Sequence, residues 1–187
     1  MAADELPLAV ASVSLVGDTL WALLCSTTTS VVAIDVRNPD EPTSVGPPTQ
    51  LEGTERPVMA DGRLAIGLGQ DRGIEVFDLS AAPRPRLMAR LAGPGTVLGL
   101  WNGLVYVARA GRVDVYRIPG GATVQDSGPP PIATYAARDF VPTAWNPGWV
   151  DGDGRVVLNR WGNGWTVLAT LPVPMRPQAH LPVAFRP

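Results

Sequence analysis

The sequence has no lysine, a single histidine and a single cysteine, and the scarcity of these residue types excludes several kinds of site. Cys25 cannot form an internal disulfide, and it lies in an apolar run where a buried, unreactive thiol is expected. His180 lies in a proline-rich tail, so no base for a cysteine nucleophile is indicated. A zinc site or a catalytic triad would have to rely on carboxylates and serine. We therefore predict no catalytic residue, no metal site and no cofactor.

Long apolar runs and clustered positive charge are also missing. No segment approaches the ~20 apolar residues that a membrane-spanning helix needs. All 15 basic residues are arginine, and they are scattered rather than gathered into the stripe that binds nucleic acid. The first residues lack the basic start and apolar stretch of a signal peptide, so we expect a cytoplasmic protein or a mature or truncated form. The sequence predicts neither a nucleic-acid partner nor a membrane span.

Glycine and proline, in contrast, are abundant, with 20 of each among 187 residues. They fall between short apolar runs, which is typical of all-β proteins with many turns. No segment of helical length repeats its apolar side chains every 3.6 positions, and glycine or proline interrupts nearly every window. The pattern predicts an all-β chain that forms a single domain over residues 1–187.

The apolar runs recur as four copies of one unit, in which a strand, a tight polar turn and a second strand precede a third strand. Leu20, Leu64, Leu104 and Val156 of the second strands follow one another at intervals of 44, 40 and 52 residues. A four-stranded blade of a β-propeller has about this length. We therefore predict a β-propeller-type array of about four four-stranded antiparallel blades, at residues 9–51, 52–93, 94–137 and 138–187. The expected strands are residues 12–16, 20–24, 31–36 and 43–45; 57–60, 64–67, 73–79 and 86–91; 97–101, 104–108, 113–118 and 132–136; 149–150, 156–159, 165–171 and 181–185.

The turns within these units carry hairpin chemistry. Asp61-Gly62 and Asn102-Gly103 are dipeptides of type I′ turns, in which both central residues need positive φ, and Gly17-Asp18 is a weaker version. The longer segment 151–154, Asp-Gly-Asp-Gly, resembles a calcium loop only faintly. It offers two carboxylates where a calcium site needs five or more oxygen ligands. We predict a hairpin turn there as well.

Two of the copies resemble a known repeat. Residues 30–42 (SVVAIDVRNPDEP) and residues 73–85 (GIEVFDLSAAPRP) are similar to the repeat of the LVIVD family of bacterial β-propellers. In that repeat an apolar strand ends in Asp, an apolar residue and Ser or Asn, before a turn that contains Pro. Asp35 and Asp78 match the aspartate, and we expect each carboxylate to bond turn amides two residues on. Arg117 stands at this position in the third copy, and the fourth copy also departs from the pattern.

The resemblance implies a fold rather than a reaction. The LVIVD family is often extracytoplasmic, so the resemblance implies that location if the N-terminus is truncated. Because the family generally uses more than four blades, it also implies a fragment of a larger propeller, or a half-ring whose end sheets pair with another copy.

Charged residues near the expected first strands give one candidate ligand site. Glu55 and Arg56 are expected in the loop that enters the second blade, and Arg138 and Asp139 in the loop that enters the fourth. Such loops open on the face where propellers usually bind ligands, so the two pairs could line a polar pocket around the axis. Solvated loop charges explain the same residues equally well.

Four tryptophans within 21 residues give a second candidate site. Trp149 and Trp165 fall at strand positions, where packing between blades is expected. Trp145 and Trp161 fall in loops or turns, where an exposed aromatic face could stack on a sugar. These two residues complete the set of candidate ligand-binding residues.

Three functions follow from these features. The first is a non-enzymatic interaction or scaffold module whose partner is a protein or a second copy of the chain. The alternative is a lactonase-like propeller hydrolase with a divalent ion on the axis, which requires Glu55 and Asp139 to converge. A third function is glycan binding through Trp145 and Trp161.

Overall fold

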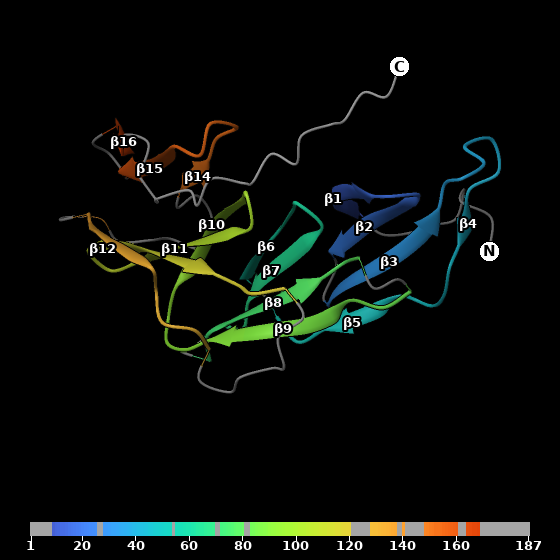
Figure 1. Ribbon diagram of the computed structural model, residues 1–187, viewed down its shortest axis with the longest axis horizontal. Helices are drawn as coiled ribbons and strands as arrows, with labels where there is room; N and C mark the ends of the chain where they lie inside the picture. The colour runs from blue at the N-terminus through green and yellow to red at the C-terminus, as the bar shows by residue number, and fades with distance from the viewer. Residues whose placement is uncertain are drawn as a thin grey trace, which may run out of the picture.

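The structure is a computed structural model that describes residues 9–25, 28–53, 55–69, 72–80, 83–120, 128–137, 140, 148–160 and 164–168, with the backbone alone for residues 9, 159–160 and 164–168. Within these ranges the regular secondary structure consists of β-strands, and the all-β class is confirmed. The strands form four antiparallel sheets that follow one another along the chain (Figure 1). None of the described residues forms a helix that is long and apolar enough to cross a membrane.

In the first sheet the strand order is β1-β2-β3, and two short strands share the remaining edge of β3. The predicted fourth strand at residues 43–45 is only the first of these, and a second, unpredicted strand follows it after Pro47 and Pro48. A proline has no N–H to donate to a ladder, so this pair interrupts the edge strand. The bounds are β1 (Ala9–Val16), β2 (Thr19–Cys25), β3 (Thr29–Asp35), β4 (Thr43–Ser44) and β5 (Thr49–Leu51).

The second and third sheets are four-stranded, with their strands in chain order. The expected strand at residues 86–91 coincides with β9, whereas β6 begins two residues earlier than expected. Glu55 and Arg56 therefore lie in a strand, and their assignment to a loop is wrong. The second sheet contains β6 (Glu55–Ala60), β7 (Arg63–Gly67), β8 (Ile74–Asp78) and β9 (Arg86–Leu91), and the third contains β10 (Thr96–Trp101), β11 (Leu104–Arg109), β12 (Arg112–Arg117) and β13 (Ala133–Ala136).

The described part of the fourth sheet has three strands, in the order β14-β15-β16. Its expected fourth strand, residues 181–185, lies outside the described residues. The bounds are β14 (Gly148–Val150), β15 (Val156–Arg160) and β16 (Gly164–Leu168).

The hairpin turns have the backbone that their residues predict. Asp61 and Gly62 have φ of 51° and 68°, and Asn102 and Gly103 have φ of 48° and 73°. Positive φ at both central residues is the mark of a type I′ turn, whose twist matches that of the flanking strands. In the Gly17-Asp18 turn only Gly17 has positive φ, which is the pattern of a type II′ turn.

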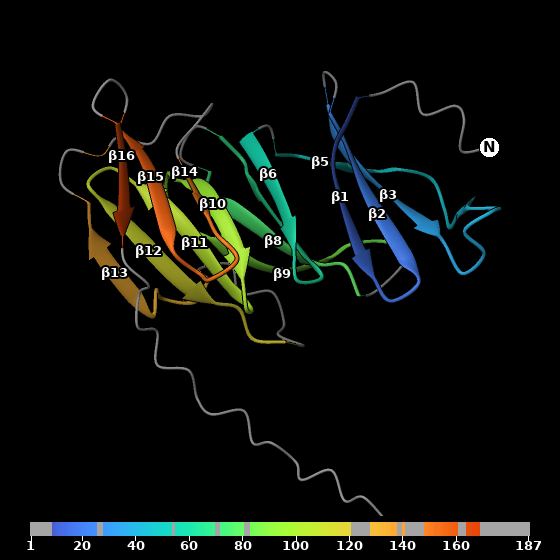
Figure 2. The same ribbon diagram turned by 90° about the horizontal axis from the view of Figure 1, so that it is seen from above.

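The four sheets lie side by side, and their first strands β1, β6, β10 and β14 form the contacts between successive sheets (Figure 2). Apolar side chains fill each of the three spaces between sheets, because a strand with apolar residues on both faces can bury them only against two neighbours. Typical core residues are Trp21 and Leu64 between the first and second sheets, Val76 and Val105 between the second and third, and Tyr106 and Leu158 between the third and fourth.

Candidate functional site

The first strands form one continuous side of the array, and this side carries the candidate residues Glu55 and Arg56. Each of β1, β6 and β10 contains a β-bulge, where its register against the second strand shifts by one residue. A bulge bends its strand and redirects side chains, and bulges are common beside binding sites. The bulges therefore make this side the first place to look for a ligand site.

Arg56 lies in the bulge of β6, where Arg56 and Pro57 together face Ile66 of β7. Its Nη1 donates a hydrogen bond of 2.8 Å to the backbone oxygen of Gly148 in β14. The side chain therefore links the second sheet to the fourth. Because the guanidinium is half-buried, desolvation lowers the pKa of Arg56.

Glu55, the neighbouring candidate, packs against Gly67 of β7. A Cβ atom at Gly67 would lie 3.0 Å from Oε2 of Glu55. The other four candidate residues, Arg138, Asp139, Trp145 and Trp161, lie outside the described residues. The convergence of the two charged pairs, and the stacking of a sugar on the two tryptophans, stay predictions.

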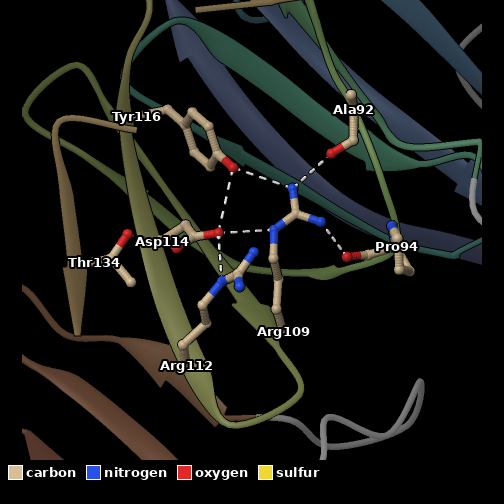
Figure 3. A network of polar contacts seen from close by, with 7 residues as sticks. All are labelled: Ala92, Pro94, Arg109, Arg112, Asp114, Tyr116 and Thr134. Carbon is tan, nitrogen blue, oxygen red and sulfur yellow. Dashed lines mark hydrogen bonds and ion pairs between the residues drawn. The ribbon is translucent and has the colours of Figure 1, made fainter. Parts of the chain in front are cut away.

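A polar cluster that sequence analysis did not single out lies within the third sheet (Figure 3). Arg109 ends β11 and Asp114 lies in β12, and their side chains are 8% and 3% exposed. Nε of Arg109 lies 2.9 Å from Oδ2 of Asp114. Thr134 of β13 donates its hydroxyl to Oδ1 of the same carboxylate at 2.8 Å. The Tyr116 hydroxyl accepts from Arg109 at 3.1 Å and donates to Asp114 at 3.5 Å.

The Arg109 guanidinium also binds the backbone that connects the second sheet to the third. It donates to the carbonyl oxygen of Ala92, at 2.8 Å, and to that of Pro94. Arg112, which is half-exposed, places Nε 3.2 Å from Oδ2 of Asp114. A buried ion pair avoids a large desolvation penalty only when its remaining polar atoms are also paired. Both carboxylate oxygens of Asp114 accept hydrogen bonds, whereas Nε of Arg109 makes the ion-pair contact without a hydrogen bond. We interpret this cluster as a cross-link between the strands and the connecting segment.

Glu75 occupies the position in β8 that Asp114 occupies in β12, because each lies two residues before the aromatic side chain of its strand. Glu75 is buried, and Arg90 of β9 places Nε 3.0 Å from its carboxylate. An acid at the same inward position of two repeats is a signal that the sequence contains. The arginine partners could not be read from it, because they depend on the register with other strands.

Two more carboxylates, Asp35 and Asp78, brace the turns that follow β3 and β8. Oδ1 of Asp35 accepts from the amide of Arg37 at 3.0 Å, and Oδ1 of Asp78 accepts from the amide of Ser80 at 2.8 Å. The predicted bonds to amides two residues on are confirmed. The Arg37 side chain lowers the pKa of Asp35. At Asp78 burial raises the pKa, but hydrogen bonds from Ser80 and Arg86 outweigh it, and the pKa is lowered.

The carboxylates described here do not gather into a metal site. In the described ranges no three or more His, Cys, Asp or Glu side chains are placed to hold an ion. In segment 151–154, Oδ1 of Asp151 accepts from the amides of Asp153 and Arg155 at 2.9 and 2.8 Å. The amide of Gly154 donates to the backbone oxygen of Asp151 at 3.0 Å, which confirms the hairpin turn.

The first and fourth sheets lie at opposite ends of the array (Figure 2). The first strand of each, β1 and β14, carries exposed apolar side chains. On β1, Val10, Val13 and Leu15 are 48%, 56% and 64% exposed. On β14, Trp149 is 40% exposed, and it lies on the opposite face from Val150, which packs toward the third sheet. Exposed apolar side chains grouped on a sheet face often mark a protein interaction site.

Comparison with known proteins adds no assignment. A scan against models of known protein families finds no match. A search of curated proteins finds no similar sequence either. The resemblance of residues 30–42 and 73–85 to the LVIVD repeat stays a prediction.

Proposed function

We propose that this chain is a non-enzymatic β-propeller-type module that acts by binding a protein surface. The packing of successive antiparallel sheets through their first strands supports the propeller arrangement, in which blades meet face to face around an axis.

The observation that carries the proposal is the exposure of apolar side chains on β1 and β14, the first strands of the two end sheets. Leu15 and Val13 on one end and Trp149 on the other are far more exposed than the apolar residues between the sheets. Burying such side chains against a partner removes apolar surface from water at roughly 25 cal/mol per Å². The end faces therefore favour association with another protein.

The described polar groups support the same function. The buried carboxylates of Glu75 and Asp114 each pair with arginine, and Asp35 and Asp78 bond the amides of their own turns. These carboxylates stabilise strands and turns, so they are already engaged within the fold.

Site-specific photo-crosslinking in the native host tests this proposal. A photoreactive residue in place of Leu15 or Trp149 is expected to form a discrete adduct with a protein. The control position is Ile132, which is 46% exposed and donates its amide to Val115 of the third sheet, not to either end sheet. No adduct from either end face, together with turnover of a small substrate by the purified chain, would overturn the proposal.

A further inference from the structure

Arg56 occupies a position of the first strand that does not need a charge for packing. This position lies five residues before the first central residue of the hairpin turn, and Ser12 and Val97 hold it in the first and third sheets. Val97 is 1% exposed and belongs to the core between the second and third sheets. Because an apolar side chain fills the same position one sheet later, the arginine calls for another explanation.

The Arg56 side chain is directed along the side of the array that the first strands form. It leaves β6 at the bulge and reaches β14, where Nη1 donates a hydrogen bond of 2.8 Å to the backbone oxygen of Gly148. A guanidinium has five N–H donors, and its hydrogen bonds to the described residues use one of them. The bond to Gly148 therefore orients the group without satisfying it.

The positive charge of Arg56 has no acidic partner among the described residues. None of their carboxylates lies within ion-pair distance of it, whereas six other arginines in the same part of the chain form such pairs. Glu55, the adjacent acid, lies against Gly67 instead. A charge that is partly removed from water is costly unless an opposite charge or hydrogen bonds compensate it.

Arg63 shows how the fold compensates another half-buried arginine. Its guanidinium donates to two backbone oxygens, those of Gly103 and Ile118. Desolvation lowers the pKa of Arg63, but the charges of Asp78 and Asp61 oppose this shift. Desolvation alone lowers the pKa of the Arg56 guanidinium, which has one such hydrogen bond.

We propose that Arg56 binds an oxyanion, the carboxylate or phosphate group of a small ligand, on the side of the array that the first strands form. The planar guanidinium presents paired N–H donors that match two oxygens of such a group. Its partial burial strengthens the attraction, because water screens the charge less. The Gly148 oxygen already orients the group, so less side-chain freedom is lost on binding. This site is separate from the proposed function, which concerns apolar side chains on β1 and β14.

Titration of the full chain with citrate and, separately, with inorganic phosphate tests this inference. Binding is followed through the NMR shifts of the backbone amides at one low ionic strength, because salt screens charge interactions. We expect saturable shifts centred on residues 55–58 and 148–150. Tighter binding of citrate would identify a carboxylate ligand, and tighter binding of phosphate would identify a phosphate ligand.

Substitutions of Arg56 assign the binding to its guanidinium. Arg56→Gln removes the charge but keeps an N–H group for the Gly148 oxygen, and it is expected to weaken anion binding by about 10-fold or more. Arg56→Lys keeps the charge without the planar fork, so we expect an intermediate loss. Arg37→Gln is the matched control and should bind as the unchanged chain does, because Arg37 is 75% exposed and paired with Asp35. Circular dichroism shows that each variant is folded, and Arg56→Lys carries the comparison if Arg56→Gln is not.

Three results would overturn the inference. The first is no saturable binding of either anion, and the second is an equal loss in the Arg56 variants and in Arg37→Gln. The third is binding that appears only in Asp139→Asn, since a carboxylate of the chain itself would then be the partner of Arg56. The proposed function is tested by photo-crosslinking at positions 15 and 149, so either idea can fail while the other stands.

Discussion

Arg109 and Asp114 form an ion pair in which both side chains are buried, so we expect stability to depend strongly on it. Asp114→Ala would leave the Arg109 guanidinium buried beside fewer acceptors. Removing one partner of a buried pair typically costs 3–5 kcal/mol, because the remaining charge is uncompensated. We expect a loss of about 3 kcal/mol in the free energy of unfolding, since Ala92, Pro94 and Tyr116 still accept from Arg109. Urea unfolding followed by circular dichroism measures it.

Arg112 gives the matched control for this prediction. It contacts the same carboxylate at 3.2 Å but is half-exposed, so water screens its charge. We expect Arg112→Ala to cost no more than about 1 kcal/mol. Equal losses for Asp114→Ala and Arg112→Ala would contradict the buried cross-link.

Tyr106 makes stability depend on alkaline pH. The phenol is buried between the third and fourth sheets, and desolvation raises its pKa to about 12. Between about pH 10 and 12 the unfolded chain loses this proton while the native chain keeps it, so stability falls as pH rises, by up to about 1.4 kcal/mol per pH unit. Urea unfolding at several pH values measures this slope. Tyr106→Phe should make this slope shallower, and an unchanged slope would rule out Tyr106 as its source. Burial also raises the pKa of Tyr135, which therefore contributes in the same direction.

At the scale of the elements, the hairpin turn between β14 and β15 packs against Trp101 of the third sheet. Its indole Nε1 donates to the backbone oxygen of Gly152 at 3.2 Å, and a Cβ atom at Gly154 would lie 2.6 Å from the ring. Gly154 also has φ of +76°, where a side chain is strained. Gly154→Ala is therefore expected to cost about 2 kcal/mol or more in thermal or urea unfolding.

Substitutions at two other glycines distinguish the cost of backbone strain from the cost of a steric clash with Trp101. Gly111 has φ of +72° and open space around it, so Gly111→Ala tests strain alone, at about 1 kcal/mol. Gly152 has open space and no positive φ, so Gly152→Ala is expected to be nearly neutral. If Gly154→Ala costs no more than Gly111→Ala, the fit of Trp101 against this turn is not tight.

Strands and turns were predictable because their signals are local. Asn102-Gly103 determines a turn through its own φ preferences, and the alternation around it identifies both flanking strands. The bulge at Arg56 and Pro57 was missed, because it depends on the register with the partner strand rather than on its own residues. Strand β5 was missed because, although Pro47 and Pro48 mark a break, only the pairing with β3 shows that a strand resumes after them. The ion pair between Arg109 and Asp114 was missed for the same reason, since a register and a connecting segment bring its atoms together.

At the scale of the whole molecule, each sheet packs mainly on the sheets next to it in the chain. In such arrays stability is approximately the sum of each unit and its nearest-neighbour contacts, so a defect at one contact remains local. Arg63 reinforces one such contact, because it donates from the second sheet to the backbone oxygen of Gly103 in the third at 2.6 Å. Arg56, in contrast, links the second sheet to the fourth. Arginine suits this role, because its planar group can donate several hydrogen bonds at once.

Gly99 allows this local behaviour to be tested, because its Cα lies where β10 and β14 meet. Gly99→Val would drive a branched side chain into Val150 and separate the third and fourth sheets, at a cost of about 1–3 kcal/mol. Hydrogen exchange should then accelerate by about 10- to 100-fold in β14 and β15, while β2 and β3 keep their protection. Gly46→Ala is the control, because its added Cβ makes only an ordinary contact with Pro83. Equal acceleration in all four sheets would mean that the array unfolds as one unit, and that a defect between two sheets is not contained by the contacts on either side of it.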